Sequence, residues 1–447
     1  MDNGSWVQVT AGVVALWSLT GLVACASAGP KAELHPAQQG AAPQSIEAQR
    51  DLGIRLNTLG DVAMAAGDLA AAKARYEESL RIFQKLAQAK PDSAKAQRDL
   101  SVSLSNLGDV AVQSGDLPFA RARFEQSLGI RQKLAQGNPT SAQAQHDLSF
   151  SLNRLGDVAV QAGDLPSARA RFEQSLGIAQ TLAQGNPTSA QAQRDLGVSL
   201  SNLGDVAVQA GDLPSAKARF EQSLGIAQTL AQGNPTSAQA QRDLRFSLNR
   251  LGDVAMQAGD LPSARARFEQ SLGIAQTLAQ RDPTSAQAQR DLGVSLLKHG
   301  DVAVQAGDLP AAKARYEESL SIFHKLVQSN HTSAEAQQNL GVSLARLGDV
   351  AVQAGDLPSA RARFEQSLGI RQKLAQSNHT SAEAQRGLSI SLFKLGHVAV
   401  QAGDLPSAKA TLGESVSILK KLAQRGALTP SDRQLLDRLE RILKSLP

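Results

Sequence analysis

The chain has 447 residues, of which 42% are hydrophobic and 3% aromatic, and its formal net charge is +5. This length allows two or three ordinary domains, and the apolar fraction is large enough for a buried core. The small positive excess forms no basic block, so it argues only weakly for an anionic partner. The one cysteine, Cys25, excludes an internal disulfide framework and a cysteine metal site.

Residues 4–30 carry no charge, and residues 11–24 read AGVVALWSLTGLVA. This run is too short and too rich in small residues for a comfortable membrane-spanning helix, and it resembles a secretion signal. The residues LVAC, ending at Cys25, resemble the bacterial lipobox, whose cysteine is lipidated on sulfur and becomes the new amino terminus. We therefore expect a lipoprotein signal at 1–28, lipidation at Cys25, and a tether with three prolines at 29–43.

The resemblance to a lipobox also implies a location. Ala26 after the cysteine fits sorting to the outer membrane, so we expect a lipoprotein of the bacterial envelope that faces the periplasm. Cleavage after Ala28 would instead release the chain into the periplasm, and an uncleaved segment would anchor it. The start MDNGSW lacks the basic residues of such signals. Either the true start lies upstream, or the positive-inside rule places the array in the cytoplasm.

The rest of the chain repeats every 48 residues. A Gly-Asp pair marks seven units, from Gly60-Asp61 to Gly348-Asp349, and the eighth unit has Gly396-His397. A fixed period of this length indicates a solenoid or another repeat array. The predicted units are 44–91, 92–139, 140–187, 188–235, 236–283, 284–331, 332–379 and 380–427.

Each unit is predicted to form two helices of about 20 residues. In the third unit, Thr140 and Gln143 fit a capping box for the first helix, as Thr332 and Glu335 do in the seventh. Gly163 is expected to end that helix, and Asp164 to cap the second one. Pro166 is tolerated in the first turn of the second helix. No segment shows the alternation of a strand.

At these positions the unit resembles the tetratricopeptide repeat, a helix-turn-helix module. Its signature residues correspond to Leu155, Gly156, Ala159, Ala168 and Phe172. The glycine and both alanines recur in all eight units, because a larger side chain would push the helix pair apart. The aromatic position is filled by Tyr76, Phe124, Phe172, Phe220, Phe268, Tyr316 and Phe364. The resemblance implies an all-α, right-handed α-solenoid.

Two departures from that family stand out. The repeat has 48 residues instead of 34, so the pitch of the superhelix cannot be transferred. The eighth unit carries Leu412 in place of the aromatic residue and His397 in place of the aspartate, as expected of a terminal, capping repeat. Residues 428–447 follow it as an amphipathic segment, predicted to be a helix that covers the exposed end.

In the family the first helices line the concave surface. On the third unit, the face opposite the packing residues carries Phe150, Arg154, Asp157 and Gln161. The aspartate and glutamine barely change between units, whereas the first two positions do. The predicted peptide-binding groove consists of Val102, Asn106, Asp109, Phe150, Arg154, Asp157, Gln161, Val198, Asn202, Asp205, Gln209, Phe246, Arg250, Asp253, Gln257, Arg346 and Asp349.

A structural alternative stands beside this interpretation. Arg154 and Asp157 are also spaced as a surface ion pair of one helix, and the aspartates could bond the neighbouring unit. The family's carboxylate clamp requires asparagine where this chain has aspartate, so a clamp for chaperone carboxyl termini is not expected.

Catalytic chemistry is not indicated. His331 and His379 occupy equivalent turns, and no nucleophile-base set, phosphate loop or metal-ligand spacing can be assembled. We therefore expect no enzyme, cofactor, metal or small-molecule substrate, and a scaffold that binds a protein or peptide. Nucleic acid is disfavoured by the acidic row and the lack of stacking aromatics. The alternative function is a cytoplasmic sensor or adaptor array that works with a separate signalling effector.

Overall fold

The computed structural model describes residues 45–331 and 333–446. The predicted signal segment, Cys25 and the tether lie outside these residues. All regular structure within them is helical, which confirms the prediction of an all-α solenoid of helix-turn-helix repeats. The seventeen helices of this part are α2 (Ile46–Ala65), α3 (Leu69–Ala89), α4 (Ala94–Ser114), α5 (Leu117–Gly137), α6 (Ala142–Ala162), α7 (Leu165–Gly185), α8 (Ala190–Gln209), α9 (Leu213–Gly233), α10 (Ala238–Gln257), α11 (Leu261–Arg281), α12 (Ala286–Gln305), α13 (Leu309–Ser329), α14 (Ala334–Gln353), α15 (Leu357–Ser377), α16 (Ala382–Gln401), α17 (Leu405–Gln424) and α18 (Pro430–Ser445).

The starts of the first helices of the third and seventh units, α6 and α14, differ from the sequence prediction by one residue. Ser141, not Thr140, is the N-cap of α6, and its hydroxyl accepts a hydrogen bond from the Ala144 amide. The predicted capping box is therefore wrong. Gln143 donates to the Asp147 carboxylate instead, at 2.8 Å, because it already lies inside the helix and reaches forward along it. Ser333 likewise caps α14, and Thr332 lies outside the described residues.

The turn inside each unit agrees with the prediction. Gly163 has φ of 78°, a left-handed conformation that favours glycine. Asp164 then caps α7 by accepting from the Ser167 amide at 3.1 Å, and Pro166 lies in the first turn. This sharp turn sets the two helices of a unit antiparallel and side by side.

In the first seven units the aromatic residue packs against the glycine of the first helix. A Cβ atom on Gly156 would lie 2.4 Å from the Phe172 ring, so only glycine fits there. Phe172 also joins a cluster with Leu200, Leu203 and Val206 of the next unit. Its full burial contributes roughly 2–3 kcal/mol and ties neighbouring units together.

A chain of buried serines runs beside these aromatic residues. Ser175 is fully buried, and its hydroxyl hydrogen-bonds to Ser149 at 2.7 Å and to Ser199 of the next unit at 3.1 Å. Equivalent contacts recur along the array, for example between Ser223 and Ser247. Small hydroxyls therefore satisfy one another where the helices approach most closely.

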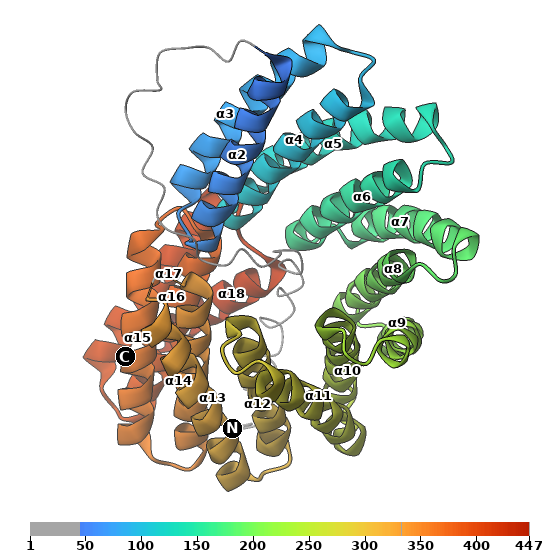
Figure 1. Ribbon diagram of the computed structural model, residues 1–447. Helices are drawn as coiled ribbons and strands as arrows, with labels where there is room; N and C mark the ends of the chain where they lie inside the picture. The colour runs from blue at the N-terminus through green and yellow to red at the C-terminus, as the bar shows by residue number, and fades with distance from the viewer. Residues whose placement is uncertain (1–44, 332, 447) are drawn as a thin grey trace.

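The array curves until its two ends meet (Figure 1). The Asn378 amide donates to the Gly67 carbonyl, and the Arg425 guanidinium donates to the Ser114 carbonyl at 2.7 Å. Each pair is 311 residues apart, or about six and a half 48-residue repeats. This offset gives the length of one superhelical turn.

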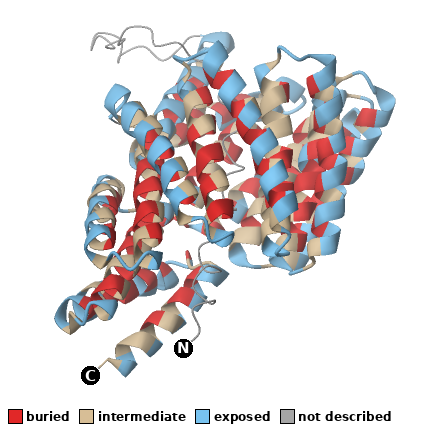
Figure 2. Cartoon of the chain, turned by 90° about the horizontal axis from the view of Figure 1, so that it is seen from below, coloured by how far each residue is buried: buried red, intermediate tan, exposed pale blue. Residues whose placement is uncertain are grey.

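The carboxyl-terminal helix α18 packs on the last repeat. Leu435 and Leu439 are buried in one cluster with Leu412 and Leu419 of α17. Figure 2 shows buried residues concentrated between paired helices and exposed ones along the turns. Among the described residues, no helix is both long enough and apolar enough to cross a membrane.

Candidate binding groove

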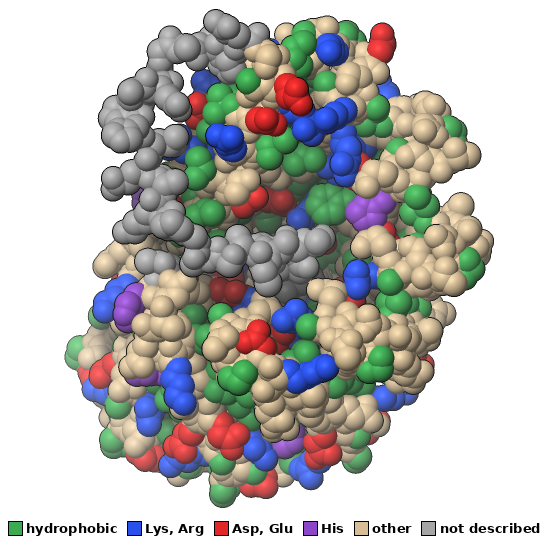
Figure 3. Space-filling view, in the orientation of Figure 1, with side chains coloured by type: hydrophobic (Ala, Val, Ile, Leu, Met, Phe, Trp, Pro, Cys, Tyr) green, Lys and Arg blue, Asp and Glu red, His purple; other side chains and the backbone are tan. Residues whose placement is uncertain are grey.

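The first helices of the units lie on the inner side of the curve. In Figure 1, α6 and α8 lie inside α7 and α9, and successive first helices such as α6 and α8 contact each other. Figure 3 shows the molecule hollowed at its centre, with acidic, basic and apolar side chains in the visible part of the hollow. The predicted groove residues belong to these inner helices and are mostly half-buried.

Most of the variable polar residues are ion-paired with the preceding unit. Arg154 lies 3.5 Å from Asp109, Arg250 lies 3.0 Å from Asp205, and Arg346 lies 3.1 Å from Asp301. Two lysines continue the series, with Lys298 at 2.6 Å from Asp253 and Lys394 at 2.6 Å from Asp349. We call this series the groove ladder. The structural alternative is therefore realised at these positions, since the aspartates bond the neighbouring unit.

Two positions of the groove ladder have no cation from the next unit. Asn106 and Asn202 occupy the positions from which the arginine or lysine of other units reaches the preceding aspartate, which is Asp61 and Asp157 in these two rungs. Asp61 accepts a hydrogen bond from the Tyr76 hydroxyl at 2.6 Å. Among the described residues, the one cation within ion-pair distance of Asp157 is Arg154 of its own helix, at 4.0 Å. We call the pair of Asp157 and Asn202 the open rung.

The pKa values of the ladder aspartates differ between Asp157, at the open rung, and Asp205, which is paired with Arg250. Desolvation, together with the nearby charges of Asp109 and Asp205, raises the pKa of the Asp157 carboxyl to about 7 against the attraction of Arg154. Desolvation likewise raises the pKa of Asp205 to about 6, although Arg250 lowers it. The side chains of Asp157 and Asp205 keep 26% and 20% of their surface exposed. Negative charge is therefore least compensated at Asp157.

The apolar groove positions differ in how well they are covered. The Arg154 guanidinium lies 4.8 Å from the Phe150 ring centre, and Arg250 lies 4.8 Å from that of Phe246. Val102 is half-buried, whereas Val198 is 46% exposed. Gln161 is half-buried, and Gln209 and Gln257 are exposed.

A second ionic series was missed in the sequence. Arg50 pairs with Asp99 at 2.5 Å, Arg194 with Asp243 at 2.7 Å, and Arg386 with Asp432 at 2.8 Å. We call this series the amino-end ladder, because it joins the starts of successive first helices. The recurring string QRDL could have revealed it, since its arginine reaches the aspartate of the following unit in four of five cases, at Arg50, Arg98, Arg194 and Arg242.

His146 takes the place of arginine in one rung of the amino-end ladder. Its Nε2 lies 3.3 Å from Asp195, and its Nδ1 lies 3.8 Å from Asp147. Hydrogen bonding to Asp147 and Asp195 raises the pKa of His146 to about 9. The imidazolium is therefore a structural cation at neutral pH.

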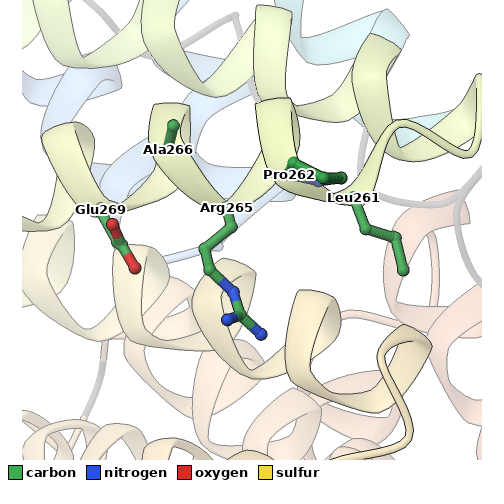
Figure 4. A pocket seen from close by; sticks show the side chains of 5 residues that line it. All are labelled: Leu261, Pro262, Arg265, Ala266 and Glu269. Carbon is green, nitrogen blue, oxygen red and sulfur yellow. The ribbon is translucent and has the colours of Figure 1, made fainter.

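On the outer surface, the hollow along α11 is too shallow to enclose a small ligand. Leu261, Pro262, Arg265, Ala266 and Glu269 line a shallow hollow of about 420 Å³ and extend from the single helix α11 (Figure 4). Among residues 45–331 and 333–446, no group of three or more His, Cys, Asp or Glu side chains is arranged to hold a metal ion. The groove is thus the surface where polar and apolar side chains converge.

Three stretches of the chain match models of the tetratricopeptide repeat, namely residues 51–133, 249–309 and 341–366. They lie in the first two, the fifth and sixth, and the seventh predicted units. The comparison with curated proteins gives no match.

Several solved structures are similar to the chain. The apo form of RapI is 11% identical, with 89% of this chain and 99% of that chain covered and a TM-score of 0.47. A signal transduction ATPase with a tetratricopeptide repeat sensor from Pyrococcus horikoshii is 13% identical, with 90% and 50% covered and a TM-score of 0.48. BtubC from P. vanneervenii is 20% identical, with 58% and 92% covered and a TM-score of 0.45. The architecture described above rests on this chain's own helices and on the matched repeats.

Proposed function

We propose that this chain is a non-enzymatic scaffold that binds a peptide or protein partner in the concave groove of its repeats. The matched repeat type is typically a non-catalytic interaction scaffold. One observation carries the proposal: the units agree at their packing positions and differ on the groove face, as at Phe150 and Val198 or at Arg154 and Asn202. Concave solenoid surfaces are the usual binding surfaces of such arrays.

The groove can be tested with photo-crosslinking side chains placed in the intact chain. We expect Val198 and Gln161 positions to trap the same partners, and the outward position Gln174 of α7 to trap none of them. All three lie at the surface or half-buried, so the label should not disturb the core. Equal trapping at Gln174 would contradict binding in the groove.

We also propose that the array is tethered to the membrane of a bacterial envelope through its amino-terminal segment. The lipobox-like residues ending at Cys25 support this. Labelling of cells with a fatty acid should mark the wild type and not Cys25→Ala, with Asp157→Asn as a control that keeps the label. Label on Cys25→Ala, or on neither protein, would contradict lipidation at this cysteine.

A further inference from the structure

We propose that Asp157, Asn202 and Val198 form a docking position for one basic side chain of the partner, a lysine or arginine that stands beside an apolar residue. This inference rests on the proposed function, namely that the groove binds a peptide. It names where in the groove the partner is anchored and by which chemistry.

The charge of Asp157 at the open rung is complementary to a basic side chain of the partner. In the complete rungs, the cation that pairs with each aspartate comes from the next first helix, as Arg250 does for Asp205 at 3.0 Å. At the open rung that position holds Asn202, whose side chain makes no hydrogen bond within the described residues. A partner's ammonium or guanidinium would complete the rung in the same place as the chain's own cations.

Arg154 does not replace the missing cation at Asp157. Arg154 lies nearer to Asp109, at 3.5 Å, than to Asp157, at 4.0 Å. The same spacing of 4.0 Å separates Arg346 from Asp349, although Lys394 already pairs with Asp349 at 2.6 Å. Asp349 thus has both a contact within its own helix and a cation from the next unit. A contact within one helix is therefore not a substitute for the pair between units.

The apolar residue one helical turn before Asn202 is Val198, and it is left uncovered. Arg154 and Arg250 lie over the rings of Phe150 and Phe246, and so shield those apolar groups from water. Asn202 is too short to cover Val198, which stays 46% exposed. Val198 is also the one large exposed hydrophobic side chain outside α2 among the described residues. An uncovered valine and a carboxylate that lacks a cation from the next unit fit a basic residue with an apolar neighbour.

The chain itself supplies the variants that test this. Asn202→Arg copies the residue at the equivalent position 250, so it should fold and close the rung from within. Asp157→Asn removes the charge with little change of shape. Gln174→Arg is the matched control, because it adds the same charge at an exposed position on the outer side of α7. Thermal unfolding of each variant verifies that it is folded.

Displayed random ten-residue peptides would be selected on the purified wild type and on each variant. We expect wild-type peptides to be enriched in lysine or arginine next to an apolar residue. The enrichment should fall at least about tenfold for Asn202→Arg and Asp157→Asn, and it should persist for Gln174→Arg. Wild-type peptides without a basic preference, or a preference unchanged by Asn202→Arg, would overturn the docking position. Selection of no peptide at all would instead contradict the groove as a peptide-binding site.

Discussion

The Asn378 side-chain amide donates a hydrogen bond to the Gly67 carbonyl, although 311 residues separate them in the chain. Arg425 and Ser114 repeat this relationship one unit later, with the same separation. A Cβ atom on Gly115 would lie 2.7 Å from that of Ala382, so the surfaces of the two turns are in tight contact. The last units therefore rest against the turns of the first ones, and this contact fixes the width of the groove.

Removal of the contact between the turns should open the superhelix. We predict a larger radius of gyration for Asn378→Ala combined with Arg425→Ala, because both bonds between the turns are lost. Small-angle X-ray scattering measures this. The control is Asn234→Ala, since Asn234 makes the same local bond to a threonine as Asn378 does but contacts no distant turn. An equal change in the control would show that local capping, not closure, is responsible.

The packing of Gly156 against Phe172 predicts a difference between two glycines of neighbouring helices. Gly156→Ala should lower the free energy of unfolding by about 1–3 kcal/mol, because its Cβ would overlap the ring. At Gly177 nothing lies within 4 Å of an added Cβ, so Gly177→Ala should raise stability by up to about 1 kcal/mol through helix propensity. Urea unfolding followed by circular dichroism distinguishes them. A loss of stability in both variants would contradict the packing account.

His146 should make stability depend on pH above neutrality. Its pKa is raised to about 9 in the folded chain, against 6.5 for the ordinary imidazole. The imidazolium's contribution is fully present below pH 6.5 and is lost as the pH rises through 9. His146→Arg keeps the cation, as the other units do, and should remove this loss, which is on the order of 1 kcal/mol for a partly exposed side chain. Melting temperatures of the wild type and His146→Arg from pH 6 to 10 measure this loss. The same dependence on pH in both proteins would contradict the role of His146.

The open rung should make stability fall with rising pH as well, but at lower pH than His146 does. The pKa of Asp157 is raised from 3.8 to about 7 by burial and by Asp109 and Asp205, against Arg154. The folded chain therefore favours the protonated form, and stability falls as the pH rises from about 4 to 7. Asn202→Arg should restore on the order of 1 kcal/mol near pH 8 and almost none near pH 4. Unfolding in urea at the two pH values tests this, and a gain of equal size at both would contradict it.

The sequence predicted the helices and their turns because these depend on local signals. The left-handed glycine at 163 and the capping aspartate at 164 act within a few residues, and so does Pro166. The N-cap was placed at Thr140 instead of Ser141 because two adjacent hydroxyls compete for the same role and a one-residue shift changes no periodic pattern.

The contacts between units were harder to predict from the sequence. The sequence left open whether Asp157 and its counterparts bind a partner or the neighbouring unit, since the repeat period gives no distance between first helices. The structure pairs five of these aspartates with the next unit and leaves Asp157 without such a cation. The meeting of Asn378 with Gly67 could not be predicted either, because it depends on a small rotation summed over more than six units.

The central claim is that a partner binds in the groove at the open rung. Its most direct test is the dissociation constant of one selected lysine-containing peptide, measured by fluorescence anisotropy on wild type, Asn202→Arg and Gln174→Arg. The two variants add the same charge, one inside the groove and one on the outer surface. We predict about tenfold weaker binding for Asn202→Arg and unchanged binding for Gln174→Arg. Equal affinities for all three proteins, or an equal loss in both variants, would contradict the claim.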